Sequence, residues 1–254
     1  MAYERRSSMS GHGHWDAVTG SQADVGAWPP ASFMGQLGPD LCERLLHDSG
    51  SRQYEPGAIL LAQGQMSTHV VIIRSGLVKV AAVAEDGRES LLSIRGRGDI
   101  VGELAAMDGL PRSATVSAWG KVGTREITQA HFRAFLEGNA AASSAVAHTV
   151  ADRLRVATRR RVELGGHSAR IRVVHVLVEL GFAYGKDIPG GHRLIDLQLT
   201  HADLAAAAGV AVRTAQRVID ELAREGIVSK RYRGVTIERP DRLAVMASDR
   251  EIPA

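Results

Sequence analysis

Apolar residues in the first half of the chain occur in short runs separated by regularly spaced glycines. Between residues 57 and 120, a regular series of glycines stands at positions 57, 64, 76, 87, 98, 109 and 120, with Gly96 and Gly102 outside the series. The runs between them are β-branched or alternate with polar residues, at 58–61, 70–73, 77–80 and 91–94. Intervals of about 8–12 residues are typical of a strand with its turn in an antiparallel sheet, and Asp86-Gly87 is a hairpin signal. The pattern predicts an antiparallel β-roll.

The hydrophobic pattern beyond residue 127 changes to the helical period. It predicts a short helix at 131–136, a long one at about 140–164 ended by Gly165-Gly166, and a third at 168–184 before a glycine-rich loop at 185–191. On the long helix a narrow apolar seam is formed by Val146, Val150, Leu154 and Ala157. A narrow seam is typical of a contact between two helices and predicts a homodimer. Packing of this helix on the β-roll of its own chain explains the seam equally well.

Residues 200–224 carry two short helices joined by a tight turn. Thr200 is a helix-capping residue with Asp203 three places later, and Gly209 ends the first helix. The second helix, at 212–224, has apolar residues on one side and polar donors on the other. Small residues where two helices cross and a glycine at the turn are features of the helix-turn-helix motif.

Hydrogen-bond donors gather on the second helix and on the following segment, 226–237, which we predict to be a β-hairpin wing. Such side chains bind guanine edges, adenine edges and phosphates. The predicted DNA-binding residues are Thr200, Arg213, Thr214, Gln216, Arg217, Lys230, Arg231 and Arg233. A solvated helical bundle is the alternative, but a helix pair together with a basic wing favours DNA.

The composition mainly rules out classes of protein. With 254 residues, 44% of them hydrophobic, the chain is long enough for two domains, and its net charge of +3 favours acidic partners only weakly. The lone Cys42 excludes an internal disulfide framework and a cysteine-ligated iron–sulfur cluster, which fits a reducing cytoplasm. The longest apolar stretch is too short to cross a bilayer. We expect no metal, because His12 and His14 lie in a predicted mobile tail without further ligands.

The segment 102–116 combines residue types that bind a ribose phosphate. Gly102 lets the backbone approach a ligand, and the helical turn after it directs N–H groups at an anion. Glu103 suits ribose hydroxyls, Arg112 offers a planar fork to a phosphate, and Ser113 adds a hydroxyl. From the residues alone, purely structural roles for Glu103 and Arg112 remain an alternative.

The order Gly-Glu-Leu, Gly, Pro-Arg-Ser-Ala in this segment resembles the phosphate-binding cassette of cyclic-nucleotide-binding domains. With the β-roll before it and the helices behind it, residues 33–243 resemble the cyclic-AMP receptor protein/fumarate-nitrate regulator (CRP/FNR) family. The resemblance implies an α+β fold: an N-terminal antiparallel jelly roll, a long central dimerisation helix and a C-terminal winged helix-turn-helix. It also implies a dimer that holds an effector between each β-roll and the central helix and reads a two-fold DNA site.

The effector-binding residues that we expect on this basis are Gly102, Glu103, Leu104, Arg112, Ser113, Thr158, Leu92 and Ser93. Members that respond to cyclic AMP bind the purine through two adjacent hydroxyl residues, where this chain has Ala157-Thr158. The recognition helix also departs from the family's common Ser-Arg-Glu-Thr-Val, since residues 211–215 read Ala-Val-Arg-Thr-Ala. These departures leave the preferred base and the operator sequence open. The resemblance of the cassette implies a cyclic nucleotide, cyclic AMP or a relative, as allosteric effector, and no required cofactor.

The sequence as a whole predicts a cytoplasmic, homodimeric transcription regulator with operator DNA and RNA polymerase as partners, and no membrane contact. An enzyme is not expected, because Gly96, Gly98 and Gly102 have the wrong spacing for a dinucleotide fingerprint and no other catalytic motif appears. The alternatives are a ligand-independent or differently controlled regulator of the same fold, and a cyclic-nucleotide-binding interaction module without DNA binding. The predicted domains are a tail (1–30), the effector domain (31–138), the central helix (139–165), the DNA-binding domain (166–246) and a second tail (247–254).

Overall fold

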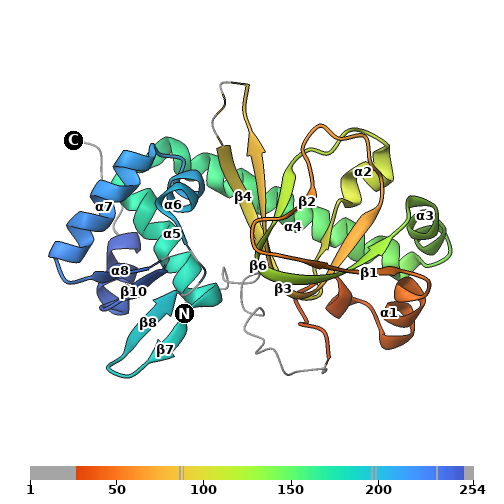
Figure 1. The fold of residues 1–254 in the computed structure, drawn as a ribbon, viewed down its shortest axis with the longest axis horizontal. Helices are drawn as coiled ribbons and strands as arrows, with labels where there is room; N and C mark the ends of the chain where they lie inside the picture. Colours follow the sequence, from red (N-terminus) through yellow and green to blue (C-terminus); the bar gives the residue numbers. More distant parts are fainter. Residues whose placement is uncertain are drawn as a thin grey trace, which may run out of the picture.

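The computed structural model describes residues 27–248 apart from residues 86, 88, 196, 198 and 233, with the backbone alone at 159–165. Most of the two predicted tails, and with them His12 and His14, lie outside the described residues, and so does Arg233. Figure 1 shows two lobes, one built around a β-sheet and one rich in helices, connected by the long helix α4 (Ala140–Gly166).

The N-terminal lobe is the predicted antiparallel β-roll. Its strands are β1 (Gly50–Tyr54), β2 (Ile59–Leu61), β3 (Val70–Val83), β4 (Glu89–Arg95), β5 (Ile100–Val101) and β6 (Thr115–Ile127). They pair in the order β1-β6-β3-β4, with β2 on β6 and β5 on β3. The strands β3 and β4 form a hairpin around Gly87, although Asp86 itself lies outside the described residues.

Two of the glycines expected in turns lie inside long strands instead. Gly76 is part of β3 and Gly120 of β6, with φ of +79° and +96°. A Cβ atom on Gly76 would lie 2.2 Å from the carbonyl oxygen of Lys121, and the β3–β6 register shifts between Ser75 and Leu77. Gly76 is therefore a bulge glycine that lets two strands approach closely. The two runs predicted at 70–73 and 77–80 consequently form one strand.

Helices close one side of the roll. They are the 3-10 turn η1 (Met34–Gln36), α1 (Pro39–Leu46), α3 (Gln129–Glu137) and the first half of α4, while α2 (Glu103–Asp108) lies in the cassette. Residues 70–73 are apolar throughout because both faces of β3 are covered there. Val70 and Ile72 pack with Phe132 of α3, and Val71 and Ile73 pack inside the roll.

The predicted dimerisation seam on α4 has a half that packs on the roll of its own chain and an exposed half. The helix ends at Gly166, within the glycine pair that was expected to end it. Val146 is only 1% exposed and packs, together with Val150, on the β-roll of its own chain. Leu154 is 66% exposed, and Ala157 is exposed too. Val146 is therefore buried within the chain and unavailable to a partner, whereas the second half of the seam is open to solvent.

The C-terminal lobe contains the predicted winged helix-turn-helix. Its elements are α5 (Ala169–Tyr184), β7 (Lys186–Ile188), β8 (His192–Ile195), α6 (His201–Ala208), α7 (Val212–Arg224), β9 (Val228–Arg231), β10 (Gly234–Ile237) and α8 (Pro240–Ser248). The strands pair in the order β7-β8-β10-β9. The segment predicted as a glycine-rich loop at 185–191 instead holds β7 and its turn into β8, where Lys186 pairs with Leu194.

The two lobes are packed against each other. The helix α6 contacts β4, and Leu91, Ile94 and Trp119 of the roll belong to the same apolar cluster as the core of the C-terminal lobe. Figure 1 shows α6 on the side of the C-terminal lobe that faces β4. Space between the lobes is thus enclosed by elements of both.

Candidate functional site

The segment predicted as a phosphate-binding cassette begins at a glycine with little room around it. Gly102 has φ of +83° and precedes the short helix α2. A Cβ atom there would lie 2.5 Å from Nη1 of Arg112 and 3.0 Å from a methyl group of Leu61. Both the backbone conformation and the close approach of Arg112 therefore require glycine at this position.

Three hydrogen bonds fix the guanidinium of Arg112. Its Nε donates to Oγ of Ser67 (3.0 Å), and its Nη1 donates to the carbonyl oxygen of Gly102 (2.8 Å). Its Nη2 donates to the carbonyl oxygen of His69 (2.6 Å). The side chain is 4% exposed, and burial lowers its pKa while the Glu103 carboxylate opposes that shift. A guanidinium has five N–H donors, so these three bonds hold Arg112 in place and leave donors for an anion.

The second charged residue of the cassette is tied to the central helix. Glu103 forms an ion pair with Arg153 of α4, whose Nη2 also donates to the carbonyl oxygen of Ile100 at 2.5 Å. The pair connects the cassette with α4 across 50 residues of sequence. Arg153 is absent from the residues predicted from the sequence. Its i,i+4 relation to Ala157, which places both on one helix face, is the signal that points to it.

A cavity of about 630 Å³ lies beside the cassette. The predicted residues that line it are Leu92, Ser93, Gly102, Glu103, Leu104, Arg112 and Ser113. Thr158 is the exception, because it is exposed and outside the lining, whereas Ala157 is part of it. Neighbouring residues point about 100° apart around a helix, so only one of the pair 157–158 faces the cavity. Thr158 therefore lies outside the cavity lining in the single chain, and its expected contact with an effector stays a prediction.

The far wall of the cavity comes from the C-terminal lobe. Arg172, His175 and Glu179 of α5 line it, together with residues 206–209 at the end of α6. The ring of His175 also lies 5.1 Å, centroid to centroid, from that of His167 at the end of α4. None of these residues was predicted to line an effector site, because their positions depend on how the two lobes pack and not on any local pattern.

The start of α6 is stabilised as its sequence predicts. The Asp203 amide donates to Oγ1 of Thr200 (3.1 Å) and the Thr200 amide to Oδ2 of Asp203 (2.9 Å), which is a complete capping box. Gly209 ends the helix at φ of +61°. The Thr200 hydroxyl thus caps the helix that crosses in front of α7.

The recognition helix α7 buries one side and exposes the other. Its apolar residues Ala215, Val218, Ile219 and Leu222 are buried. Of the predicted DNA-binding residues, Arg213, Gln216 and Arg217 are exposed and Thr214 is half-buried. The structure therefore brings the three long donors together on one solvent-facing surface.

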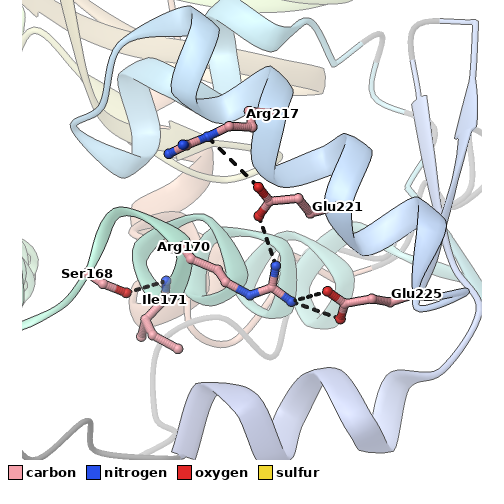
Figure 2. A network of polar contacts seen from close by, with 6 residues as sticks. All are labelled: Ser168, Arg170, Ile171, Arg217, Glu221 and Glu225. Atoms are coloured by element: carbon pink, nitrogen blue, oxygen red, sulfur yellow. Dashed lines mark hydrogen bonds and ion pairs between the residues drawn. The ribbon is translucent and has the colours of Figure 1, made fainter.

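The exposed Arg217 belongs to a series of ion pairs that joins α7 to α5 (Figure 2). Its Nε lies 3.9 Å from Oε1 of Glu221, while Oε2 of Glu221 lies 3.1 Å from Nη1 of Arg170. Nη2 of Arg170 lies 2.8 Å from both carboxylate oxygens of Glu225. Because Arg170 takes the shorter contact to Glu221, Arg217 is held only loosely, and its side chain stays 70% exposed.

The β9–β10 hairpin forms the wing and is joined to α7. Lys230 makes an ion pair with Asp220 of α7, and its hydrogen bond lowers the pKa of that carboxyl. Nε of Arg231 donates to Oγ1 of Thr236 at 2.9 Å. Tyr232 at the wing tip is 92% exposed, a position that sequence reasoning missed. No helix among the described residues is long and apolar enough to span a membrane.

Comparison with known proteins agrees with this arrangement. Residues 51–139 match the family model of the cyclic nucleotide-binding domain, and residues 171–246 match that of the Crp-like helix-turn-helix domain. The chain is 28% identical over 188 residues to the CRP-like cAMP-activated global transcriptional regulator of Mycobacterium tuberculosis, an alignment that covers 74% of this chain and 84% of the relative. It is also 28% identical over 192 residues to the cyclic AMP receptor protein of Thermus thermophilus, covering 76% and 85%.

Solved structures show the same likeness. A CRP/FNR-family transcriptional regulator from Thermus thermophilus superposes with a TM-score of 0.67 at 25% identity, covering 79% of this chain and 100% of that one. A β-roll with a phosphate-binding cassette, joined by a long helix to a winged helix-turn-helix, defines a class of DNA-binding transcription regulators. The chain belongs to the CRP/FNR family of that class. The relatives that it matches are regulators and not enzymes.

Proposed function

We propose that this protein is a homodimeric regulator whose affinity for a two-fold operator is set by a cyclic nucleotide, cyclic AMP or a relative, bound in the cavity. The observation that carries the proposal is the shared wall. One cavity is lined by the cassette, by α4, and by α5 and α6 of the DNA-binding lobe. A ligand there contacts the DNA-binding lobe directly and favours the lobe position in which its own contacts are best.

In the proposed complex, Arg112 and Ser113 hold the cyclic phosphate and Glu103 accepts hydrogen bonds from the ribose. The preorganised Arg112 guanidinium supports the first assignment, because its donors need no rearrangement to bind an anion. Leu92, Ser93 and Leu104 supply the remaining wall on the roll side. Ala157 offers the base a methyl group only, so base selectivity arises from other parts of the cavity.

The proposed dimer joins the second halves of two α4 helices. Leu154 and Ala157 support this contact because their side chains are exposed in the single chain. Two recognition helices then engage half-sites about one DNA turn, roughly 34 Å, apart. Within each half-site we assign base contacts to Arg213, Gln216 and Arg217, with Thr214 beside them. Phosphate contacts fall to Lys230, Arg231 and Arg233 of the wing and to the α6 terminus at Thr200.

The proposed division of labour follows these contacts. We assign effector binding to residues 31–138, dimerisation to 139–165 and DNA binding to 166–246, with tails at 1–30 and 247–254. RNA polymerase is the proposed protein partner, and the cytoplasm is the proposed location, since operator DNA and nucleotide are both present there.

The test is DNA binding measured by fluorescence anisotropy, with duplexes selected by the protein from a random-sequence pool. We expect saturating cyclic AMP to change the operator Kd by at least about fivefold, the lower end of allosteric coupling. Arg112→Gln removes this response, while Lys121→Gln, an exposed change on β6, leaves it intact. An operator Kd that cyclic AMP, cyclic GMP and other nucleotides all leave unchanged would show a ligand-independent regulator instead.

A further inference from the structure

The cavity contains more positive charge than a single cyclic phosphate neutralises. Four arginines and two glutamates line it. One of these glutamates, Glu103, is already paired with Arg153. A cyclic mononucleotide carries one negative charge, so binding one at Arg112 leaves a further cation in the cavity without an anion.

The additional cation is Arg95, the last residue of β4. Its side chain lines the cavity and is 9% exposed. Burial and the neighbouring Arg153 lower its pKa to about 10, against the weaker opposing effects of Asp99, Tyr184 and Glu103. Among the described residues, no ion pair joins Arg95 to a carboxylate.

A buried arginine close to another arginine is costly for folding alone. Taking a charge out of water without an opposite charge beside it is unfavourable, so packing does not explain a cation here. An anion bound beside Arg95 would offset the cost, because charge-assisted hydrogen bonds are about twice as strong as neutral ones. The position of Arg95 therefore suits ligand binding better than it suits packing.

We infer that Arg95, beside the Glu103–Arg153 ion pair, forms a second anion subsite, so that the preferred effector is a nucleotide carrying two negative charges. This inference rests on the proposed function, because it takes the cavity to be the effector site. Two kinds of nucleotide have this chemistry: a cyclic dinucleotide with two phosphodiesters, and a linear mononucleotide whose phosphomonoester is doubly charged above a pKa of about 6. The cavity of about 630 Å³ lies in the range of ligand sites in proteins.

The experiment is calorimetric titration of the full-length protein with cyclic AMP, cyclic di-AMP and 5′-AMP, which share one base. We expect one of the two dianions to bind at least about tenfold more tightly than cyclic AMP, as one additional charge-assisted hydrogen bond provides. Whether cyclic di-AMP or 5′-AMP is preferred identifies the source of the second charge.

The variants assign the effect to Arg95. Arg95→Met removes the charge and keeps an unbranched side chain. It should weaken binding of the preferred dianion about tenfold or more, and binding of cyclic AMP less than about threefold. Arg95→Lys should retain most of the preference, which also guards against a folding defect in the methionine variant. Arg97→Met is the matched control, because Arg97 lies over the ring of Trp28 and outside the cavity lining.

Three results would overturn the inference. If cyclic AMP binds as tightly as both dianions, or if Arg95→Met weakens all three nucleotides alike, the second subsite is wrong while effector control stands. If the wild-type protein binds none of the three, both the subsite and the proposed nucleotide control are contradicted.

Discussion

Nζ of Lys79 lies 2.6 Å from Oδ1 of Asp203, which joins β3 of the roll to α6 of the DNA-binding lobe. The same Asp203 carboxylate closes the capping box of α6, and the Lys79 ammonium lies 5.3 Å from the centroid of the Trp119 ring. Both side chains are mostly buried, at 25% and 12% exposure. One carboxylate therefore both starts a helix of the DNA-binding motif and holds that motif against the effector domain.

We predict that Lys79→Met loosens the contact between the lobes. The loss of this partly buried pair should weaken the packing of the two lobes against each other by about 1 kcal/mol. The substitution leaves the capping box intact, which a change at Asp203 would not. Amides of β4 and α6 should then exchange hydrogen faster, as measured by mass spectrometry, while amides of β1 keep their rates.

The matched control for this prediction is Lys121→Met, at an exposed position of the same sheet. It should leave exchange in β4 and α6 unchanged. Equal exchange rates in the Lys79 variant and the wild-type protein would mean that the apolar contact around Leu91, Ile94 and Trp119 alone holds the lobes together.

We also predict that Gly102→Ala damages effector binding beyond its effect on stability. The left-handed backbone, at φ of +83°, costs any L residue about 1 kcal/mol or more. The new Cβ atom would in addition meet Nη1 of Arg112 at 2.5 Å and displace the preorganised guanidinium. Nucleotide affinity, measured by calorimetry, should fall by at least about tenfold as that charge-assisted contact is lost.

Gly57→Ala separates the two effects. Gly57 has a nearly identical φ of +84°, but a Cβ atom there meets nothing within 4 Å. The Gly57→Ala variant should lose about as much free energy of unfolding in urea as Gly102→Ala does, and it should keep the nucleotide affinity of the wild type. If both variants bind nucleotide like the wild type, Arg112 is not part of the effector site.

The features that the sequence predicted best are those encoded locally. The capping box of Thr200 and Asp203 and the terminal Gly209 lie within ten residues of one another, and each was placed correctly as a helix boundary. The apolar face of α7 repeats at the helical period, which needs no tertiary information. The helix-turn-helix is therefore readable from one short segment.

The features that it missed depend on partners far along the chain. Gly76 looks like a turn glycine until Lys121 of the neighbouring strand approaches it. Arg153 becomes a site residue only because α4 passes beside Glu103, and Arg95 only because both surround one cavity. Val146 was predicted to lie on a dimer seam, but the roll of its own chain covers it first.

The ion pairs between α5 and α7 lead to a third prediction, that Arg170 positions Arg217 for DNA. Without Arg170, the Glu221 carboxylate is free to approach Arg217 from its present 3.9 Å and to occupy the guanidinium to which we assign base contacts. Arg170→Ala should therefore weaken operator binding, by up to the roughly 1–3 kcal/mol expected for loss of a bidentate base contact. Fluorescence anisotropy over a series of salt concentrations measures the change.

The second substitution Glu221→Gln should rescue the Arg170 variant, because a neutral amide competes only weakly for Arg217. A purely structural role for Arg170 would lower thermal stability without any such rescue. Arg224→Ala, an exposed change at the end of α7, is the control for lost positive charge. A double variant that binds operator no better than Arg170→Ala alone would contradict the positioning role.

The single cysteine gives a fourth prediction that tests the core of the roll. The Cys42 side chain is 6% exposed, and its thiol donates to the carbonyl oxygen of Met34 at 3.2 Å. Burial raises the pKa of this thiol, so the folded protein holds the proton more firmly than the unfolded chain does. The resulting stability is complete at neutral pH and is lost as the pH rises through the raised pKa.

Iodoacetamide should therefore leave Cys42 unmodified in the folded protein and label it fully in concentrated urea, as counted by intact mass. Ser51→Cys, on the exposed edge strand β1, provides a second thiol that should react rapidly in the folded state. That variant should gain one adduct and no more. Two adducts under native conditions would mean that α1 opens from the roll on the time scale of labelling, because the thiolate of Cys42 forms only when the helix moves away.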